Sequence, residues 1–226
     1  MDELTGLCTR LLGGNKAATQ AARRAREAEG RVGQLAAALA NCRALRDDPP
    51  VAGQPAADPR PDAADPRPDA ADPRHEAAEL AVNAGLAGAV AQELGTATAR
   101  LPQRQQEALA LRELLGLSHE LVAEVLGIDP AAVTALLARS RTRLHAELRG
   151  VKTEPGSCPE RDRTARTATL RQDGQPVSTA DEDWLLDHLG HCDGCRRLHA
   201  TMLEASVCYR AWPVSLADPG RAITAA

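Results

Sequence analysis

The sequence predicts an all-α fold, with a helix-turn-helix bundle and a second, small helical domain, joined by a disordered Pro-rich linker. Between residues 101 and 150, apolar residues recur at helical spacing, and residues typical of helix starts and ends separate the repeats. Residues 49–74 are rich in proline, which interrupts helices. Aromatic residues are 1% of the chain, too few for a β-rich barrel or sandwich.

The composition limits the possible functions. The 226 residues carry a net charge of −4, so any contact with nucleic acid must be local. No apolar run approaches the roughly 18 residues of a membrane span, and the N-terminus lacks the apolar core of a secretion signal, so we expect a cytoplasmic protein without membrane contact. Six cysteines in that reducing compartment are expected as thiols or metal ligands. No Ser/His/Asp constellation, phosphate loop or paired-carboxylate pocket is found, so we expect neither an enzyme nor a small-molecule substrate.

The first section, residues 1–48, is predicted to be a weak helical segment. Strong helix formers fill residues 15–47, with Gly30 and Gly33 as interruptions. Because the apolar stripe is mostly alanine, we expect it to bury little surface.

The second section, residues 49–75, is predicted to be a linker. The sequence AADPRPD occurs at 56–62 and again at 63–69, and AADPRHE follows at 70–76. Proline excludes helix from the residue before it, so this stretch is expected to be extended and disordered.

The third section, residues 76–150, is predicted to be a helix-turn-helix domain. Gly116 ends its first long helix, which covers about 103–116. Ser118 is a suitable N-cap for the second helix, which ends near Gly127, and Asp129 caps the third.

Apolar side chains are expected to pack these helices together and to present the third one outward. Ahead of them, Leu86, Val90 and Leu94 recur at helical spacing. The packing residues are Leu111, Leu114, Leu115, Leu121, Val122, Val125 and Ile128, with Val133, Leu137, Leu144 and Leu148 on one face of the third helix.

This section resembles region 4 of the extracytoplasmic-function sigma factors, over about residues 77–150. The matching residues are Leu101-Pro102 with Arg104, the stretch from Leu111 to Leu117, Ser118-His119-Glu120, Ala123-Glu124, Leu126-Gly127-Ile128, Val133, Arg139-Ser140-Arg141 and Leu144. The resemblance implies a module that binds promoter DNA, with RNA polymerase as a partner.

The recognition helix departs from the family pattern. Two positions that are usually basic are Thr134 and Leu136, and the tip offers no side chain for a bidentate base contact. The candidate DNA-binding residues are Thr134, Arg139, Arg141 and Arg143. The alternative is a helix-turn-helix kept as a protein-docking scaffold.

Residues 1–48 are interpreted as a degenerate form of sigma region 2. Opening promoter DNA needs aromatic side chains that stack on exposed bases. The first aromatic residue of the chain is Trp184, so this section is not expected to open DNA.

The fourth section, residues 156–200, is predicted to bind zinc. His188, Cys192 and Cys195 have the spacing His-x3-Cys-x2-Cys, and Cys158 is the natural fourth ligand. Zn²⁺ prefers four nitrogen or sulfur ligands in a tetrahedron, so we expect a small zinc-stabilised helical domain. The alternative is a set of reduced structural thiols without a metal.

The section also resembles the zinc-binding anti-sigma domain, a zinc-finger family with one His and three Cys. The resemblance implies three short helices that grip a sigma factor, and some members of the family release it when the cysteines oxidise. Residues 201–226 are expected to be a tail.

Together these features predict a cytoplasmic, sigma-factor-like transcription regulator. Its helix-turn-helix would bind promoter DNA, RNA polymerase core or both, and the fused anti-sigma-like domain would pack against residues 101–150 and modulate them. The alternative is a soluble zinc-dependent anti-sigma adaptor that binds a separate sigma factor and no DNA.

Overall fold

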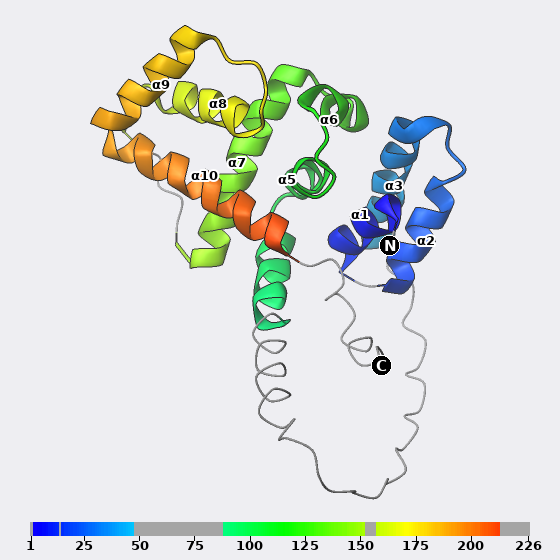
Figure 1. The fold of residues 1–226 in the computed structure, drawn as a ribbon. Coiled ribbons are helices and arrows are strands. Elements are labelled where there is room, and N and C mark those ends of the chain that lie inside the picture. Colours follow the sequence, from blue (N-terminus) through cyan, green and yellow to red (C-terminus); the bar gives the residue numbers. More distant parts are fainter. Residues whose placement is uncertain (1, 14, 48–87, 152–156, 213–226) are drawn as a thin grey trace, which may run out of the picture.

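The structure, a computed structural model, describes residues 2–13, 15–47, 88–151 and 157–212 (Figure 1). Those ranges hold helices and no strand, which confirms the all-α prediction. The predicted linker 49–75, Leu86 and residues 213–226 of the predicted tail lie outside the described residues.

The N-terminal section forms a packed three-helix unit: α1 (Glu3–Leu12), α2 (Asn15–Ala25) and α3 (Gly30–Asp47). Asp2 caps α1 by accepting a hydrogen bond from the backbone N–H of Thr5 at 3.1 Å. The buried side chains of this unit are Leu4, Leu7, Cys8, Leu11, Ala18, Ala21, Ala22, Ala25, Leu35, Ala38, Leu39 and Cys42. The expectation that this section buries little surface is wrong, because α1 adds three leucines and the small side chains of α2 let the helices approach closely.

The central section contains the predicted helix-turn-helix. It begins with a helical segment at 88–99, followed by α5 (Gln103–Leu109), η1 (Ala110–Leu114), α6 (His119–Leu126) and α7 (Pro130–Arg149). α6 and α7 are bent by 95° relative to each other.

The helix ends fall where the sequence predicts them. Ser118 accepts a hydrogen bond from the backbone N–H of Leu121, and Gly127 ends α6 with a φ of +64° that favours glycine. Asp129 accepts from the N–H of Ala131 at 2.7 Å and so caps α7.

Two details of this section differ from the prediction. The first long helix changes in its last turn to a π-helix, η1, in which the N–H of Leu115 donates to the carbonyl of Ala110 at 3.3 Å. Val90 lies on the outside with 63% of its surface exposed, while Leu94 is buried as expected.

The C-terminal section consists of α8 (Arg161–Gln172), α9 (Thr179–His191) and α10 (Asp193–Ala211), which we call the Cys/His unit. α10 continues beyond residue 200, where the sequence suggested a tail. Its last turns are buried against the central section, because Tyr209 packs with Leu94 and Leu144.

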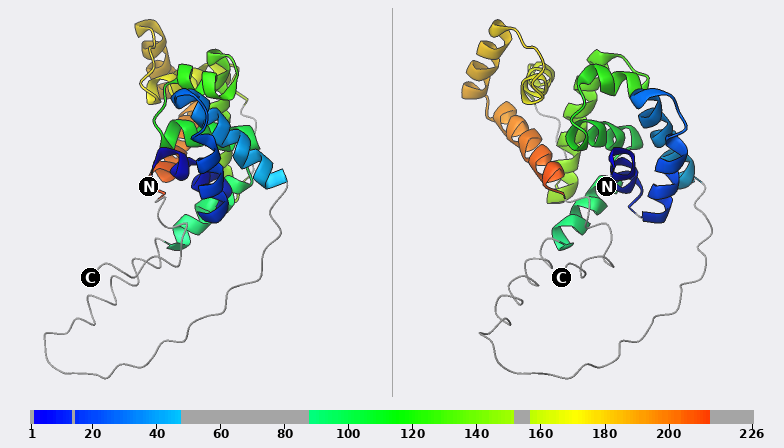
Figure 2. Two further views of the ribbon diagram at one scale, coloured as in Figure 1. Left: turned by 90° about the vertical axis from the view of Figure 1, so that its right-hand side faces the viewer. Right: turned by 45° about the vertical axis from the view of Figure 1, so that its right-hand side comes forward.

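The three sections lie side by side. α1–α3 lie on one side of α5–α7 and the Cys/His unit lies on the other (Figures 1 and 2). α3 contacts α6 and α1 contacts η1, while α8 and α10 both contact α7. α7 therefore contacts neighbouring helices along much of its length.

Across the described ranges, no single helix has the length and apolar character of a membrane span. α6 and α7 reach the length and apolar character of a span only when they are taken together, and a bend of 95° separates them.

Candidate metal centre and candidate nucleic-acid interface

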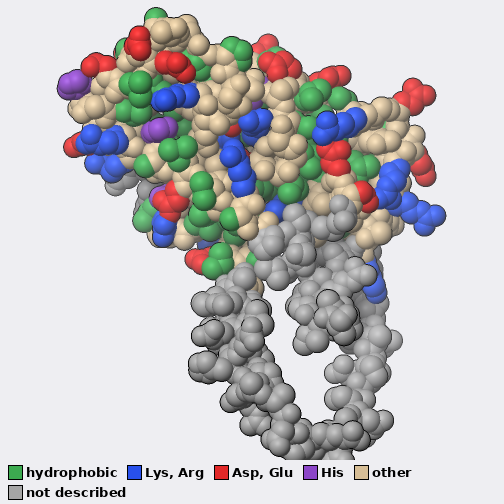
Figure 3. Space-filling view, viewed as in Figure 1, with side chains coloured by type: hydrophobic (Ala, Val, Ile, Leu, Met, Phe, Trp, Pro, Cys, Tyr) green, Lys and Arg blue, Asp and Glu red, His purple; other side chains and the backbone are tan. Residues whose placement is uncertain are grey.

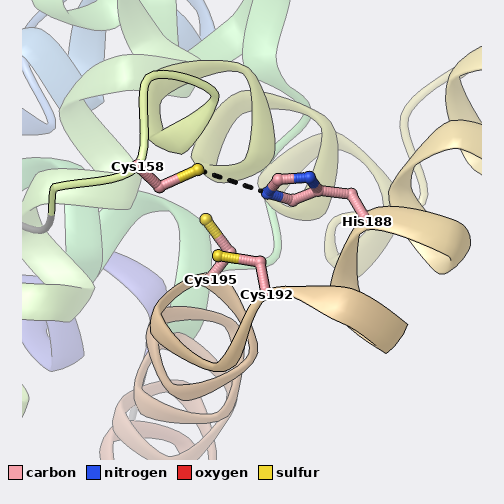
Figure 4. A group of neighbouring side chains, drawn as sticks. All are labelled: Cys158, His188, Cys192 and Cys195. Carbon is pink, nitrogen blue, oxygen red and sulfur yellow. Dashed lines mark hydrogen bonds between the residues drawn. The ribbon is translucent and has the colours of Figure 1, made fainter.

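The four predicted metal ligands come together at one end of the Cys/His unit (Figure 4). Cys158 precedes α8, His188 is on the last turns of α9, and Cys192 and Cys195 stand where α9 meets α10. Their ligand atoms all lie within 4.8 Å of one another, and Sγ of Cys158 is 3.5 Å from Nε2 of His188. The group could hold a metal ion.

The two cysteines of the Cys-x2-Cys turn differ in the direction in which the pKa of the thiol is shifted. A hydrogen bond from the backbone N–H of Cys195 lowers the pKa of Cys192 below its usual value. Burial raises the pKa of Cys195 to about 11. Trp184 stacks on the His188 ring with centroids 5.1 Å apart, which fixes the orientation of the imidazole.

The remaining cysteines stand apart from this group. Cys8 and Cys42 are both buried in the core of the N-terminal unit, and the interaction with Cys42 lowers the pKa of Cys8. Cys208 lines a groove between α10 and the helical segment 88–99. None of the three belongs to the cluster of ligands found among the described residues.

The four predicted DNA-binding residues of α7 separate into two pairs. Arg139 and Arg143 are exposed, and they stay candidates for phosphate contacts. Thr134 and Arg141 are buried, with 4% and 0% of their surfaces exposed. The structure corrects the prediction for these two residues, because neighbouring helices cover both side chains and neither is available to contact DNA.

Arg141 is held by two buried carboxylates. Its guanidinium donates to Glu113 on η1 at 2.6 and 2.8 Å, and to Asp173, at the end of α8, at 2.6 Å. Thr134 Oγ1 lies 3.2 Å from Nδ1 of His119, whose Nε2 is hydrogen-bonded to Asp173 at 2.8 Å.

These contacts form a buried polar network that joins the Cys/His unit to the helix-turn-helix. Asp173 also forms an ion pair with Arg112 at 3.2 Å, and Glu113 accepts hydrogen bonds from Ser206 and Arg210 of α10. Burial by itself raises the pKa of Asp173, but the hydrogen bonds from His119 and Arg141 and the nearby guanidinium charges outweigh it and hold the pKa well below its usual range. Sequence reasoning missed this network, since its members are far apart along the chain.

The network occupies one flank of α7 and leaves another face open. At 3.6 residues per turn, Val133, Leu137 and Leu144 share the core side. Thr134, Ala138 and Arg141 lie on the neighbouring flank, where Ala138 packs with the core of the Cys/His unit. The face opposite the core carries residues that are exposed or half-buried, namely Ala131, Ala132, Ala135, Arg139, Thr142 and Arg143.

The surface charges are mixed. Lys and Arg side chains alternate with Asp and Glu over the face shown in Figure 3, without a large area of one sign. This agrees with the net charge of −4 and means that a contact with DNA would be local.

One family model matches part of the central section. Residues 91–144 match the family described as sigma-70, region 4. A search of curated proteins and a search of solved structures find no match. Region 4 implies binding to DNA and RNA polymerase in transcription, and it is a non-enzymatic module. The chain therefore carries, within residues 91–144, a helix-turn-helix similar to sigma-70 region 4.

Proposed function

We propose that the chain is a sigma-factor-like transcription regulator that binds promoter DNA and RNA polymerase through α5–α7, under the control of the fused Cys/His unit. The observation that carries this proposal is the match of residues 91–144 to sigma-70 region 4, on a helix-turn-helix whose third helix keeps an open outer face. Arg139 and Arg143 on that face are one turn apart and suited to contact DNA phosphates.

We further propose that Cys158, His188, Cys192 and Cys195 hold Zn²⁺. Three sulfurs and one imidazole nitrogen are the donors that structural zinc sites use, at bond lengths of about 2.0–2.3 Å. When bound, the ion would supply a cross-link between the start of α8 and the junction of α9 and α10. The apolar core of this unit is small: Ala138, Ala168, Leu185, Leu198 and Met202. A metal cross-link would therefore contribute a large part of its folding free energy.

The Cys/His unit, whose sequence resembles an anti-sigma domain, is proposed to act on the helix-turn-helix of the same chain. Support comes from its contacts, because Asp173 binds residues of η1, α6 and α7 at once. A change in the metal site would then reach α7 through α8. A peroxide could oxidise Cys192 and Cys195 to a disulfide: an S–S bond forms, the O–O bond of the peroxide breaks, and the two thiol protons and two electrons leave with its oxygens as water or alcohol. This would remove two thiolate ligands and loosen the unit.

A test of the main proposal uses the full chain, loaded with zinc and kept reduced. Promoter fragments are titrated with the protein at low salt, and a tagged chain is used to recover partners from its native cell. We expect DNA binding that weakens as salt rises, together with recovery of RNA polymerase core. Loss of DNA binding in the double variant Arg139→Gln, Arg143→Gln, with its helix content unchanged, would assign the contact to α7.

One observation favours the anti-sigma adaptor as a second candidate. The outer face of α7 begins with Ala131, Ala132 and Ala135, which offer no hydrogen bonds to base edges. Recovery of a separate sigma factor without polymerase core, and no binding of any promoter fragment at low salt, would support the adaptor and contradict the main proposal.

A further inference from the structure

A groove of about 270 Å³ lies where α7 meets the Cys/His unit. One wall is α7, with Ala138, Arg139, Thr142 and Arg143, and the other is the start of α8, with Arg161, Asp162 and Ala165. Gln105 of α5 and Leu198 of α10 complete the lining. The groove therefore borders the open outer face of α7.

The groove is rich in positive charge. Three arginines line it, Arg139, Arg143 and Arg161, against one acidic residue, Asp162. Within the described residues, Arg139 and Arg161 form no ion pair, and Arg143 has only a distant one, 3.8 Å from Glu147. By contrast, Arg112 and Arg141 form ion pairs with carboxylates of the buried network. These three cations are thus available to an anion.

The remaining lining residues also leave room and a polar group for an anion. The small side chains of Ala138 and Ala165 leave space between the two helices. The Gln105 side-chain oxygen is buried and has no hydrogen-bond partner among the described residues. A rotation of 180° about the last side-chain bond exchanges the oxygen and nitrogen of an amide. The amide of Gln105 can therefore turn an N–H donor to this site.

We propose that this groove binds a phosphate group of the DNA backbone, so that Arg161 of the Cys/His unit contacts the same DNA as α7. The inference rests on the proposed DNA-binding function and extends it to a residue outside the helix-turn-helix. Guanidinium groups are well matched to phosphate oxygens in geometry and charge. A duplex lying along the outer face of α7 would bring its backbone to the side of that helix, where the groove opens.

The position of Arg161 depends on the metal-ligand cluster. Its backbone N–H donates to the carbonyl of Cys158 at 3.2 Å, so the turn that holds this cysteine also sets the first residue of α8. The Cys/His unit would therefore raise the affinity of α7 for DNA when the cluster is intact. This is the opposite of a unit that only blocks the recognition helix.

The test measures binding of a fluorescent DNA duplex to the zinc-loaded full chain over a series of salt concentrations. Three single variants are compared with the unchanged protein: Arg161→Gln, Arg139→Gln, and Arg166→Gln as a control. Arg166 is exposed on the same helix and does not line the groove. Helical circular dichroism and zinc content show whether each variant is folded.

We expect Arg161→Gln to weaken binding roughly threefold to tenfold on all sequences, as for the loss of one charge-assisted contact. The salt slope should fall by about 0.9, which corresponds to one phosphate. Arg139→Gln should behave similarly, and Arg166→Gln should match the unchanged protein.

Three results would overturn the inference. Arg161→Gln could bind as the unchanged protein does while Arg139→Gln loses affinity, or it could bind more tightly, as expected for a purely blocking unit. Arg161→Gln could also lower the affinity for inorganic phosphate, measured by calorimetry, and leave DNA binding intact, which would assign the groove to free phosphate. If the unchanged protein binds no DNA at low salt, the proposed function itself fails, and this outcome is distinct from the other three.

Discussion

Asp173 is the residue whose replacement should separate the Cys/His unit from the helix-turn-helix most directly. Its side chain is fully buried, and it bonds to Arg141 at 2.6 Å, to His119 at 2.8 Å and to Arg112 at 3.2 Å. Removing one partner of a buried ion pair costs about 3–5 kcal/mol, because the other charge stays buried without compensation. Arg141 keeps its contact with Glu113, so we expect Asp173→Ala to cost about 3 kcal/mol.

The measurement is urea unfolding of the reduced, metal-loaded chain, followed by helical circular dichroism. Asp187→Ala is the matched control, because that carboxylate is 78% exposed and its contact with His191 is worth about 0–1 kcal/mol. A loss below about 1 kcal/mol for Asp173→Ala, equal to the control, would refute the claim that the network holds the two sections together.

Asp173 also makes the free energy of unfolding depend on pH, and the direction of this dependence follows from its pKa. The pKa of Asp173 is lower in the folded chain than the roughly 3.9 of an unfolded aspartate, so the folded state favours the carboxylate. The stabilisation is therefore present above about pH 4 and is lost as the pH falls toward the folded pKa. The difference in unfolding free energy between the unchanged protein and Asp173→Asn should shrink in strong acid and not at neutral pH.

Three further predictions concern separate parts of the molecule. A strong chelator should reduce the helical signal of the Cys/His unit, and the same treatment of Cys195→Ala should give little further change; an unchanged spectrum on chelation of the normal chain would contradict a structural metal. Ser118→Ala should cost about 1 kcal/mol in unfolding free energy through loss of the α6 cap, measured by urea titration against the exposed control Ser157→Ala. Leu7→Ala should cost about 2–5 kcal/mol in the same titration, since Leu7 is fully buried, whereas a loss near zero would mean that α1 is not part of the core.

The sequence could predict features that depend on short spacings. Ser118, Gly127 and Asp129 mark helix ends by local chemistry alone, and each stands at the predicted boundary. The metal ligands His188, Cys192 and Cys195 lie within eight residues, so a single turn between two helices is enough to bring them together. Cys158 completes the group because it precedes a helix that packs beside α9.

Features that depend on distant partners could not be predicted. Arg141 has the spacing of a DNA contact, but its environment is set by Glu113 and by Asp173, which is 32 residues further along the chain. The π-turn η1 adds a residue to the helix and so changes which side chains face inward, and Glu113 lies within it. In the N-terminal section, alanine content alone did not show that α1 supplies leucines to a shared core.

The position of α7 limits how this molecule could be divided. Val133 and Leu137 belong to the core shared with the N-terminal unit, Leu144 to the core around Tyr209, and Ala138 to the core of the Cys/His unit. A fragment ending at Gly150 would leave the guanidinium of Arg141 facing water on one side and would uncover apolar surface on two others. The region-4-like segment would therefore lose part of its core packing if it were transferred to another protein without the sections on either side. Changes on its flanks would have to be inherited together with matching changes in the sections on either side.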